Sequence, residues 1–223
     1  QNVTTDAGAC TAVVNYSTVT STDNCSEPTV TYSISNGSTF SLGTTAVTVT
    51  STDEFGNVST ATFDVIVADG EAPTITAGTD ETVQCDGAGN NTELLAWLGN
   101  NGGATATDNC SAVTWSNDFT TLAYTCGSTS SVNVVFTATD DAGNASTTQG
   151  TFTIEDTTAP SIDTQATNET VECDGAGNTT AFQSWLDSHG GAAASEICSS
   201  VTWSHNYLGD FGDGVTNDFS NGC

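Results

Sequence analysis

The 223-residue sequence contains no lysine and no arginine, while its 27 aspartates and glutamates give a formal net charge of -27. No carboxylate can therefore pair with a Lys or Arg side chain, and each buried or clustered one needs backbone donors, water or a metal ion. A field of this sign repels nucleic acids and anionic membranes, so neither is an expected partner. Two interpretations of the charge remain open: it keeps the protein soluble, or divalent cations neutralise it.

Methionine is also absent, proline occurs three times, and no segment approaches the ~20 consecutive apolar residues that a membrane-spanning helix needs. Membrane insertion is therefore not expected. The chain is rich instead in Thr, Val, Ser, Ala, Gly and Asn. Thr and Val favour strands, whereas Gly, Asn and Asp favour turns, so the composition is typical of an all-β protein.

The chain repeats itself at an interval of 88 residues. The segment 83–90 recurs at 171–178, and a shorter relative of the same unit comes first, because the segment 22–26 recurs at 107–111. Repeat 1 lacks a counterpart of the start of repeat 2, and repeat 3 lacks one of its end, so we expect both to be incomplete. An interval of this length fits one sandwich domain per repeat and predicts three units, at 1–69, 70–156 and 157–223.

Hydrophobic residues alternate with polar ones in several segments, which predicts strands with one buried and one exposed face. Gly- and Asn-rich turns separate these segments, as in a β-sandwich. We therefore predict tandem Ig-like β-sandwich domains. The positions expected to be buried are Val30, Tyr32, Ile34, Val47, Val49, Phe63, Val65, Val67, Val132, Val134, Phe136, Ala138, Phe152 and Ile154.

One short helix is predicted in each of repeats 2 and 3, at 92–98 and 180–186. Threonine is a plausible N-cap for both, and the glycine pairs at 102–103 and 190–191 should stop them. Leu94, Trp97 and Leu98 share one helix face, which we expect to close one end of the sandwich. A ligand groove on this face is the alternative.

Repeat 1 resembles the hyalin repeat (HYR) domain through Thr22-Asp23-Asn24-Cys25, Gly37-Ser38-Thr39-Phe40 and the segments 43–49 and 52–57. Repeats 2 and 3 resemble related Ig-like repeats in giant surface adhesins of gliding bacteria that use type IX secretion, through the segments 156–160 and 171–174 and the Trp-containing helix. The resemblance implies an extracellular, cell-surface location. It also implies a structural stalk segment of a long bacterial adhesin or surface fibre, mediating attachment or gliding. Expected partners are neighbouring repeats of the chain, surface glycans and other cell-surface proteins.

Eight cysteines without metal-type spacing indicate disulfides and an oxidising compartment. Repeat 1 contains two cysteines, which should pair, and the other repeats should follow the same pattern. The expected bridges are Cys10–Cys25, Cys85–Cys110 and Cys173–Cys198. Cys126 is expected to be a free thiol, because the related repeats carry its partner at the position of Ala142. The partner of Cys223 is expected outside this sequence.

Carboxylates gather at two kinds of place, the last hairpin turn of a repeat and the linker that follows it. Oxygen ligands of this kind suit calcium. If each turn points toward the next repeat, the groups converge on the linker and a bound calcium ion stiffens it. Alternatively, these residues simply build turns. The candidate ligands are Asp53, Glu54, Asp69, Glu71, Asp140, Asp141, Glu155 and Asp156.

No catalytic residue is predicted, and we do not expect an enzyme. The two histidines, His189 and His205, align with Asn101 and Asn117 of repeat 2, and the chain has no Gly-x-Ser-x-Gly nucleophile motif. The competing function is an array of carbohydrate-binding modules in a secreted protein, whose tryptophans would stack on sugars. Buried tryptophans favour the stalk and exposed ones favour sugar binding. These residues are Trp97, Trp115, Trp185 and Trp203.

Overall fold

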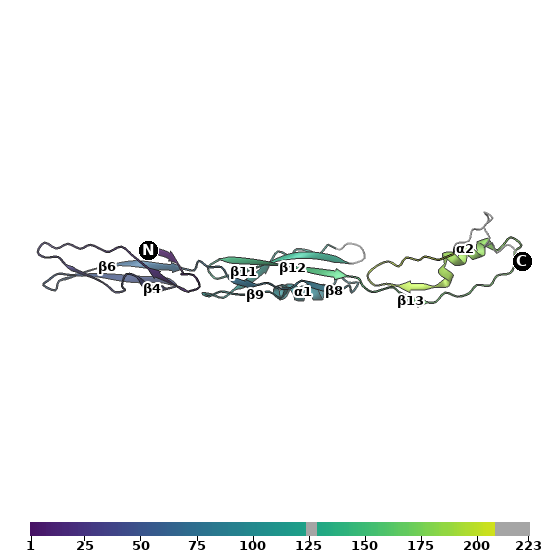
Figure 1. Cartoon of the computed structure of the whole chain (residues 1–223), viewed down its shortest axis with the longest axis horizontal. Helices are drawn as coiled ribbons and strands as arrows, with labels where there is room; N and C mark the ends of the chain where they lie inside the picture. The colour runs from purple at the N-terminus through teal and green to yellow at the C-terminus, as the bar shows by residue number, and fades with distance from the viewer. Residues whose placement is uncertain (124–128, 208–223) are drawn as a thin grey trace. The chain divides into compact units, whose positions relative to one another are not determined.

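A computed structural model describes residues 1–123 and 129–207 of the chain (Figure 1). The described residues form mainly short β-sheets, with one α-helix in each of repeats 2 and 3. The predicted all-β, sandwich-like fold with two inserted helices is therefore confirmed. The chain divides into two compact units. One comprises Gln1–Glu81, Leu95–Thr120 and Asn133–Thr151, and the other Thr82–Leu94, Thr121–Val132 and Phe152–Cys223.

Two sheets build repeat 1. The larger sheet has the strand order β1-β6-β5-β3, with β1 parallel to β6 and the other neighbours antiparallel, and the smaller sheet pairs β2 with β4. The long β5–β6 hairpin pairs every residue of β5 without a bulge. The strands are β1 (Asn2–Thr4), β2 (Thr11–Val14), β3 (Thr29–Tyr32), β4 (Ser38–Ser41), β5 (Gly43–Thr52) and β6 (Val58–Ala68).

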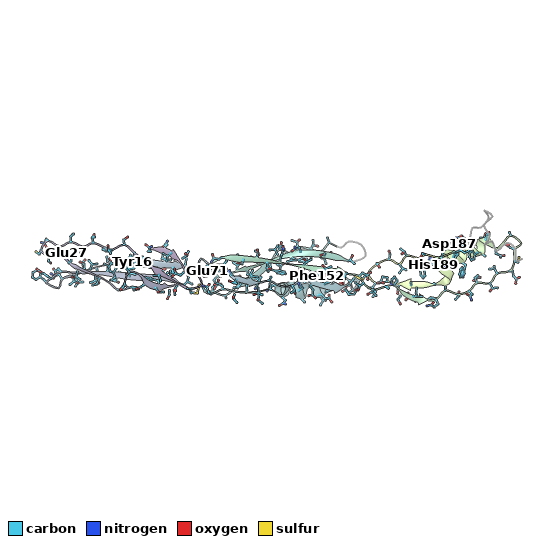
Figure 2. All side chains as sticks on the ribbon, viewed as in Figure 1. Tyr16, Glu27, Glu71, Phe152, Asp187 and His189 are labelled. Carbon is cyan, nitrogen blue, oxygen red and sulfur yellow. A yellow bond between two sulfur atoms is a disulfide. The ribbon has the colours of Figure 1, made fainter. Side chains whose placement is uncertain are left out.

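The core of repeat 1 lies between these two sheets. Alternation buries Val47 on β5 and Val65 on β6 completely, as the sequence predicts, and β2 and β4 contribute Ala12, Val14 and Phe40 from the other side. Tyr16 closes this core (Figure 2): its ring packs edge-on against Phe63, and its hydroxyl donates a hydrogen bond to the carbonyl oxygen of Ile34. Burial raises the pKa of this hydroxyl, and the neighbouring Tyr32 adds to the shift.

Repeat 2 contains a two-stranded sheet, β7–β9, and a four-stranded sheet of order β10-β11-β12-β8. Most of its predicted core positions are almost fully buried, with exposed fractions of 0% for Val134 and 1% for Phe136, whereas Val132 is half-buried. The strands are β7 (Thr74–Thr76), β8 (Glu81–Gln84), β9 (Thr105–Thr107), β10 (Thr114–Asn117), β11 (Ser130–Thr139) and β12 (Ala145–Glu155).

The helix of repeat 2, α1 (Asn91–Gly99), turns Leu94, Trp97 and Leu98 inward, and all three are buried as predicted. The Trp97 ring packs edge-on against Phe136 at a centroid distance of 5.3 Å. Gly102 follows the helix at a φ of 65°, and a Cβ there would lie 2.9 Å from the Phe136 ring, so only glycine fits. The core interpretation of this helix face is therefore confirmed over the ligand groove.

Repeat 3 contains β13 (Ser161–Thr164) paired with β14 (Ala193–Ser195), and α2 (Thr179–Asp187). The Trp185 indole donates a hydrogen bond of 2.9 Å to the carbonyl oxygen of Thr167. Trp97 makes the corresponding bond to Thr79 in repeat 2.

The predicted threonine N-caps are wrong. Asn178 occupies the N-cap of α2 in a left-handed conformation, with Thr179 and Thr180 inside the helix, and Thr92 likewise lies inside α1. Asn90 and Asn178 both reach back to the loop before the helix: each donates from its side chain to the carbonyl oxygen of Gln84 or Glu172. This hydrogen bond fixes the start of each helix two residues before Thr92 or Thr180 could do so as an N-cap.

Candidate functional site

Two disulfides join successive repeats. Cys10 of repeat 1 bonds to Cys110 of repeat 2, and Cys85 of repeat 2 bonds to Cys198 of repeat 3. The Cα atoms of the pairs lie 5.1 and 6.0 Å apart, within the ordinary range for a disulfide. The predicted bridges Cys10–Cys25, Cys85–Cys110 and Cys173–Cys198, each within one repeat, are therefore wrong.

Each bridge connects the same two places in the fold. One cysteine lies in a loop that follows β1 in repeat 1, residues 5–10, or β8 in repeat 2, residues 85–90, here called the donor loop. The other lies in the segment 107–111 or 195–199, here called the acceptor loop, which follows β9 or β14 in the next repeat. One disulfide therefore connects repeats 1 and 2 at the first junction, and another connects repeats 2 and 3 at the second.

The pairing error has a structural cause. Sequence alignment places Cys10 opposite Cys85, but Thr5 holds the place of Cys85 in the fold. The Thr5 amide donates to Ala68 and the Cys85 amide donates to Glu155, each at the end of the last strand of its repeat. The donor loop thus carries its cysteine at its end in repeat 1 and at its start in repeat 2. In both cases the loop borders the linker that leads to the next repeat.

The remaining cysteines do not form the predicted pattern either. Cys25 is free and exposed. Cys173 is disulfide-bonded, but Cys198 is not its partner, because Cys198 bonds to Cys85. Cys126 and Cys223 lie outside the described residues, so the expected free thiol at Cys126 stays a prediction.

Glu71 ties the first junction together (Figure 2). Its Oε2 accepts a hydrogen bond of 2.7 Å from the Gly8 amide in the donor loop and one of 3.1 Å from the Asn109 side chain in the acceptor loop. Asp69, two residues earlier, uses Oδ1 to accept from the Glu71 amide. One linker carboxylate therefore holds both loops around the disulfide.

The β11–β12 turn, residues 140–144, closes the same junction. Asn144 donates from its side chain to the Asp69 carbonyl oxygen at 3.4 Å, and the Asp141 amide donates to the Ser111 hydroxyl in the acceptor loop at 3.1 Å. Asp140 is buried and accepts 2.8 Å hydrogen bonds from the amide and the side chain of Asn144. Burial alone would raise the pKa of Asp140, but these bonds and those from Gly143 and Ala142 outweigh it and lower the pKa.

Replacing Asp140 by asparagine should flatten the acid limb of the stability curve. Because the pKa of Asp140 is lower in the folded state, its contribution is present above the unfolded value near ~3.9 and is lost as the pH falls through the folded value. Urea unfolding at a series of pH values should show Asp140→Asn less stable at neutral pH and equal to wild type in acid. The exposed Asp141→Asn is the matched control and should shift stability by under ~0.5 kcal/mol throughout. A deficit that persists in acid would contradict this role.

The predicted convergence of hairpin turns on the following linker does not occur. Asp53 and Glu54 precede β6 at one end, whereas Asp69 and Glu71 follow its other end. The eleven residues of the strand span roughly 35 Å. The same length of β12 separates Asp140 and Asp141 from Glu155 and Asp156. The turn of repeat 2 instead meets the linker that precedes its own repeat, because each hairpin points back along the chain.

The structure brings together carboxylates that the ligand prediction missed. At the first junction, one carboxylate oxygen of Asp69, one of Asp108 and the Cys110 sulfur all lie within 4.8 Å of one another. At the second junction, Asp156, Glu196 and Cys198 form the same arrangement. Asp69 Oδ2 is buried and has no hydrogen-bond partner among the described residues. In the sequence, only the recurring Thr-Asp-Asn-Cys motif could have identified Asp108 as a candidate ligand.

Comparisons with known proteins identify the first repeat. Residues 1–67 match the family model of the HYR domain, which confirms the predicted resemblance. No curated protein matches the sequence. Together with the sandwich fold and the disulfides, the match supports extracellular-type β-sandwich repeats. None of the helices in the described segments has the length and hydropathy to cross a membrane.

Solved structures similar to the chain include protocadherin and desmocollin extracellular domains. The protocadherin GammaB4 extracellular domain is 13% identical at a TM-score of 0.32, with 74% of this chain and 32% of that chain covered. A protocadherin gammaB7 EC3-6 cis-dimer is 16% identical at a TM-score of 0.27, covering 61% and 43%. The human desmocollin-1 ectodomain is 16% identical at 0.23, covering 56% and 29%. The chain thus spans less than half the length of each.

Proposed function

We propose that this chain is a stalk segment of a long cell-surface adhesin of gliding bacteria, in which Ig-like repeats are locked end to end. The observation that carries the proposal is the pair of disulfides between successive repeats. A bridge within a sandwich stabilises that sandwich alone, whereas a bridge between sandwiches restricts the movement of one against the next. A fibre that transmits force between a cell and a surface needs the second kind.

The buried tryptophan face weakens the carbohydrate-binding alternative. Trp97 is 7% exposed and packs on Phe136, so it offers no ring face to a sugar. Trp203 is 37% exposed, but its face stacks on His189 at a centroid distance of 4.5 Å. Sugar stacking needs an uncovered aromatic face, which Trp97 lacks and which Trp203 loses on the side that His189 covers.

Small-angle scattering tests the stalk. Three sandwiches joined end to end should give a maximum dimension on the order of 100 Å and a radius of gyration of roughly 30 Å, from strands of ~20–30 Å plus linkers. A compact globule of this length would have a radius of gyration of about 17 Å. The smaller value would rule out a stalk. Antibodies against the chain should also label intact cells of the source organism.

Calcium at the junctions is the second part of the proposal, now placed on Asp69 and Asp108 and, at the second junction, on Asp156 and Glu196. The buried Asp69 Oδ2 supports it, because a buried carboxylate oxygen without a donor is costly and no Lys or Arg exists to pair with it. Because the cysteine sulfurs are bonded in disulfides, only the carboxylate oxygens of each cluster can act as ligands, and oxygen ligands suit calcium. A cation here would also reduce repulsion between carboxylates of adjoining repeats.

Calcium should raise the melting temperature of the chain, and a chelator should lower it. A site filled at a hundredfold excess over its dissociation constant contributes about 2.7 kcal/mol. Sodium at matched ionic strength controls for screening, and magnesium should substitute poorly. Asp69→Asn/Asp108→Asn should abolish most of the calcium effect, whereas the exposed Glu54→Gln should keep it. Equal stabilisation by sodium and calcium would rule out a specific site.

A further inference from the structure

Repeat 1 carries an acceptor loop of its own, residues 22–26, with the sequence Thr-Asp-Asn-Cys-Ser that repeat 2 has at 107–111. The two loops have the same geometry. The amide of Cys25 donates to Asp23 Oδ1 at 2.8 Å, and the amide of Cys110 donates to Asp108 Oδ1 at 2.8 Å. In the second case the cysteine is bonded to the preceding repeat, and in the first it is free and exposed.

The turn that completes the acceptor surface is also present in repeat 1. Asn57 donates to Asp53 from its amide at 2.8 Å and from its side chain at 2.7 Å, as Asn144 does to Asp140. The strand register places turn and loop together in the same way: Thr29 pairs with Thr52 as Thr114 pairs with Thr139. Loop and turn are therefore already arranged to receive a partner.

Two of the differences between the two surfaces are those that a missing partner predicts. Asp140 is 5% exposed at the occupied junction, whereas Asp53 is more accessible. Phe55 replaces Ala142 at the tip of the turn and is 74% exposed. Ser26 Oγ is buried without a hydrogen-bond partner among the described residues, whereas its counterpart Ser111 accepts a hydrogen bond from the Asp141 amide of its own repeat. This last difference lies within the repeats and does not depend on a partner.

We propose that loop 22–26 and turn 53–57 form a docking surface for a further repeat of the same kind, whose donor-loop cysteine bonds to Cys25. The occupied equivalents at Cys110 and Cys198 identify the occupant as the linker end of a like repeat. Asn24 favours the repeat 1 type, because its counterpart Asn109 binds the linker Glu71, whereas repeat 3 has Ile197 there. The inference rests on the proposed function and names the partner of one surface.

The bond forms by oxidation. The two thiols lose two protons and two electrons, the new bond joins their sulfurs, and the electrons reduce a disulfide oxidant, either glutathione disulfide or an oxidised thiol oxidoreductase, to two thiols.

The test extends the whole chain at Gln1 with a copy of residues 1–69, whose own Cys25 is serine, followed by a copy of residues 70–80 as the linker. The copy contains a complete core of its own kind and one thiol, the added Cys10. After oxidation with glutathione disulfide, peptide mapping should show the added Cys10 bonded to Cys25. Alkylation of Cys25 should fall by about tenfold or more relative to the unextended chain, because the linker holds the thiols together.

The control is the same extended chain with Cys25→Ser and Thr62→Cys, which moves an exposed thiol to the middle of β6 and should not bond. A second extension, a copy of 70–156 with Cys85 as its only thiol, supplies an independent donor. Cys25 that stays alkylatable in both, or equal bonding at Thr62→Cys, overturns the proposal. The native Cys10–Cys110 peptide in the same digest distinguishes failure of this proposal from failure of the proposed function. If that peptide is present, the disulfide between repeats 1 and 2 is supported; if it is missing, the proposed stalk is contradicted as well.

Discussion

Replacing Cys10 and Cys110 by serine should lower the free energy of unfolding by about 4 kcal/mol, since closing a loop of this size contributes ~4.7 kcal/mol in the chain-entropy model. The bridge spans a sequence separation of 100 residues, which makes the constraint on the unfolded chain large. A bridge between Cys10 and Cys25 would close a much shorter loop and would leave the junction unconstrained. A loss of about 4 kcal/mol is therefore expected for the Cys10–Cys110 bridge and a smaller loss for a Cys10–Cys25 bridge.

Denaturant unfolding of the double variant, compared with wild type in the presence and absence of reductant, measures this loss. Cys25→Ser is the matched control, because Cys25 is free and exposed in the chain. Limited proteolysis of the linker at Gly70 and Glu71 should accelerate in the double variant and stay unchanged in the control. An unchanged free energy of unfolding after reduction would contradict the account of the junctions.

Phe136→Ala should destabilise repeat 2 by about 3–5 kcal/mol, the usual cost of removing a buried aromatic ring. Phe136 is 1% exposed, contacts Trp97 edge-on and lies close to Gly102, so its truncation leaves a cavity in the core. The matched control is Phe55→Ala, where the same ring is 74% exposed and its loss should cost under ~0.5 kcal/mol. Thermal unfolding of both variants measures the difference, and equal effects would contradict the placement of the core.

The elements that the sequence predicts well are those in which local pattern and packing agree. Alternation placed Val47, Val65, Val134 and Phe136 in the core, because in a sandwich one face of each strand must be buried. The spacing of Leu94, Trp97 and Leu98 likewise predicted the buried face of the helix correctly. The N-caps were not, because Asn90 and Asn178 gain hydrogen bonds to the preceding loop that a threonine-capped helix would lose.

Disulfide pairing was beyond the reach of the sequence. Six cysteines already allow fifteen connectivities, and the choice among them depends on which loops meet in space. Two cysteines in one repeat suggest a bridge within it, but Cys10 bonds to Cys110 of repeat 2 and Cys25 is free. The two donor loops are also hard to recognise as equivalent in the sequence, because Thr5 occupies in repeat 1 the structural position that Cys85 has in repeat 2.

The expected direction of the acidic hairpin turns is wrong, whereas calcium binding stays a prediction. The acidic turns and linkers exist as expected, but each hairpin points back along the chain, so Asp140 approaches the linker before its repeat. The direction of a hairpin follows from strand topology, which no local pattern reveals. Asp108, the carboxylate beside Asp69, was visible only as part of a repeated motif whose role was unknown.

Peptide mapping of the unreduced, alkylated protein tests the central claim most directly. The account predicts a cross-linked peptide pair containing Cys10 and Cys110, a second containing Cys85 and Cys198, and alkylated Cys25. A pair containing Cys10 and Cys25, with Cys110 bonded to Cys85, would place every bridge within one repeat and contradict the locked junctions.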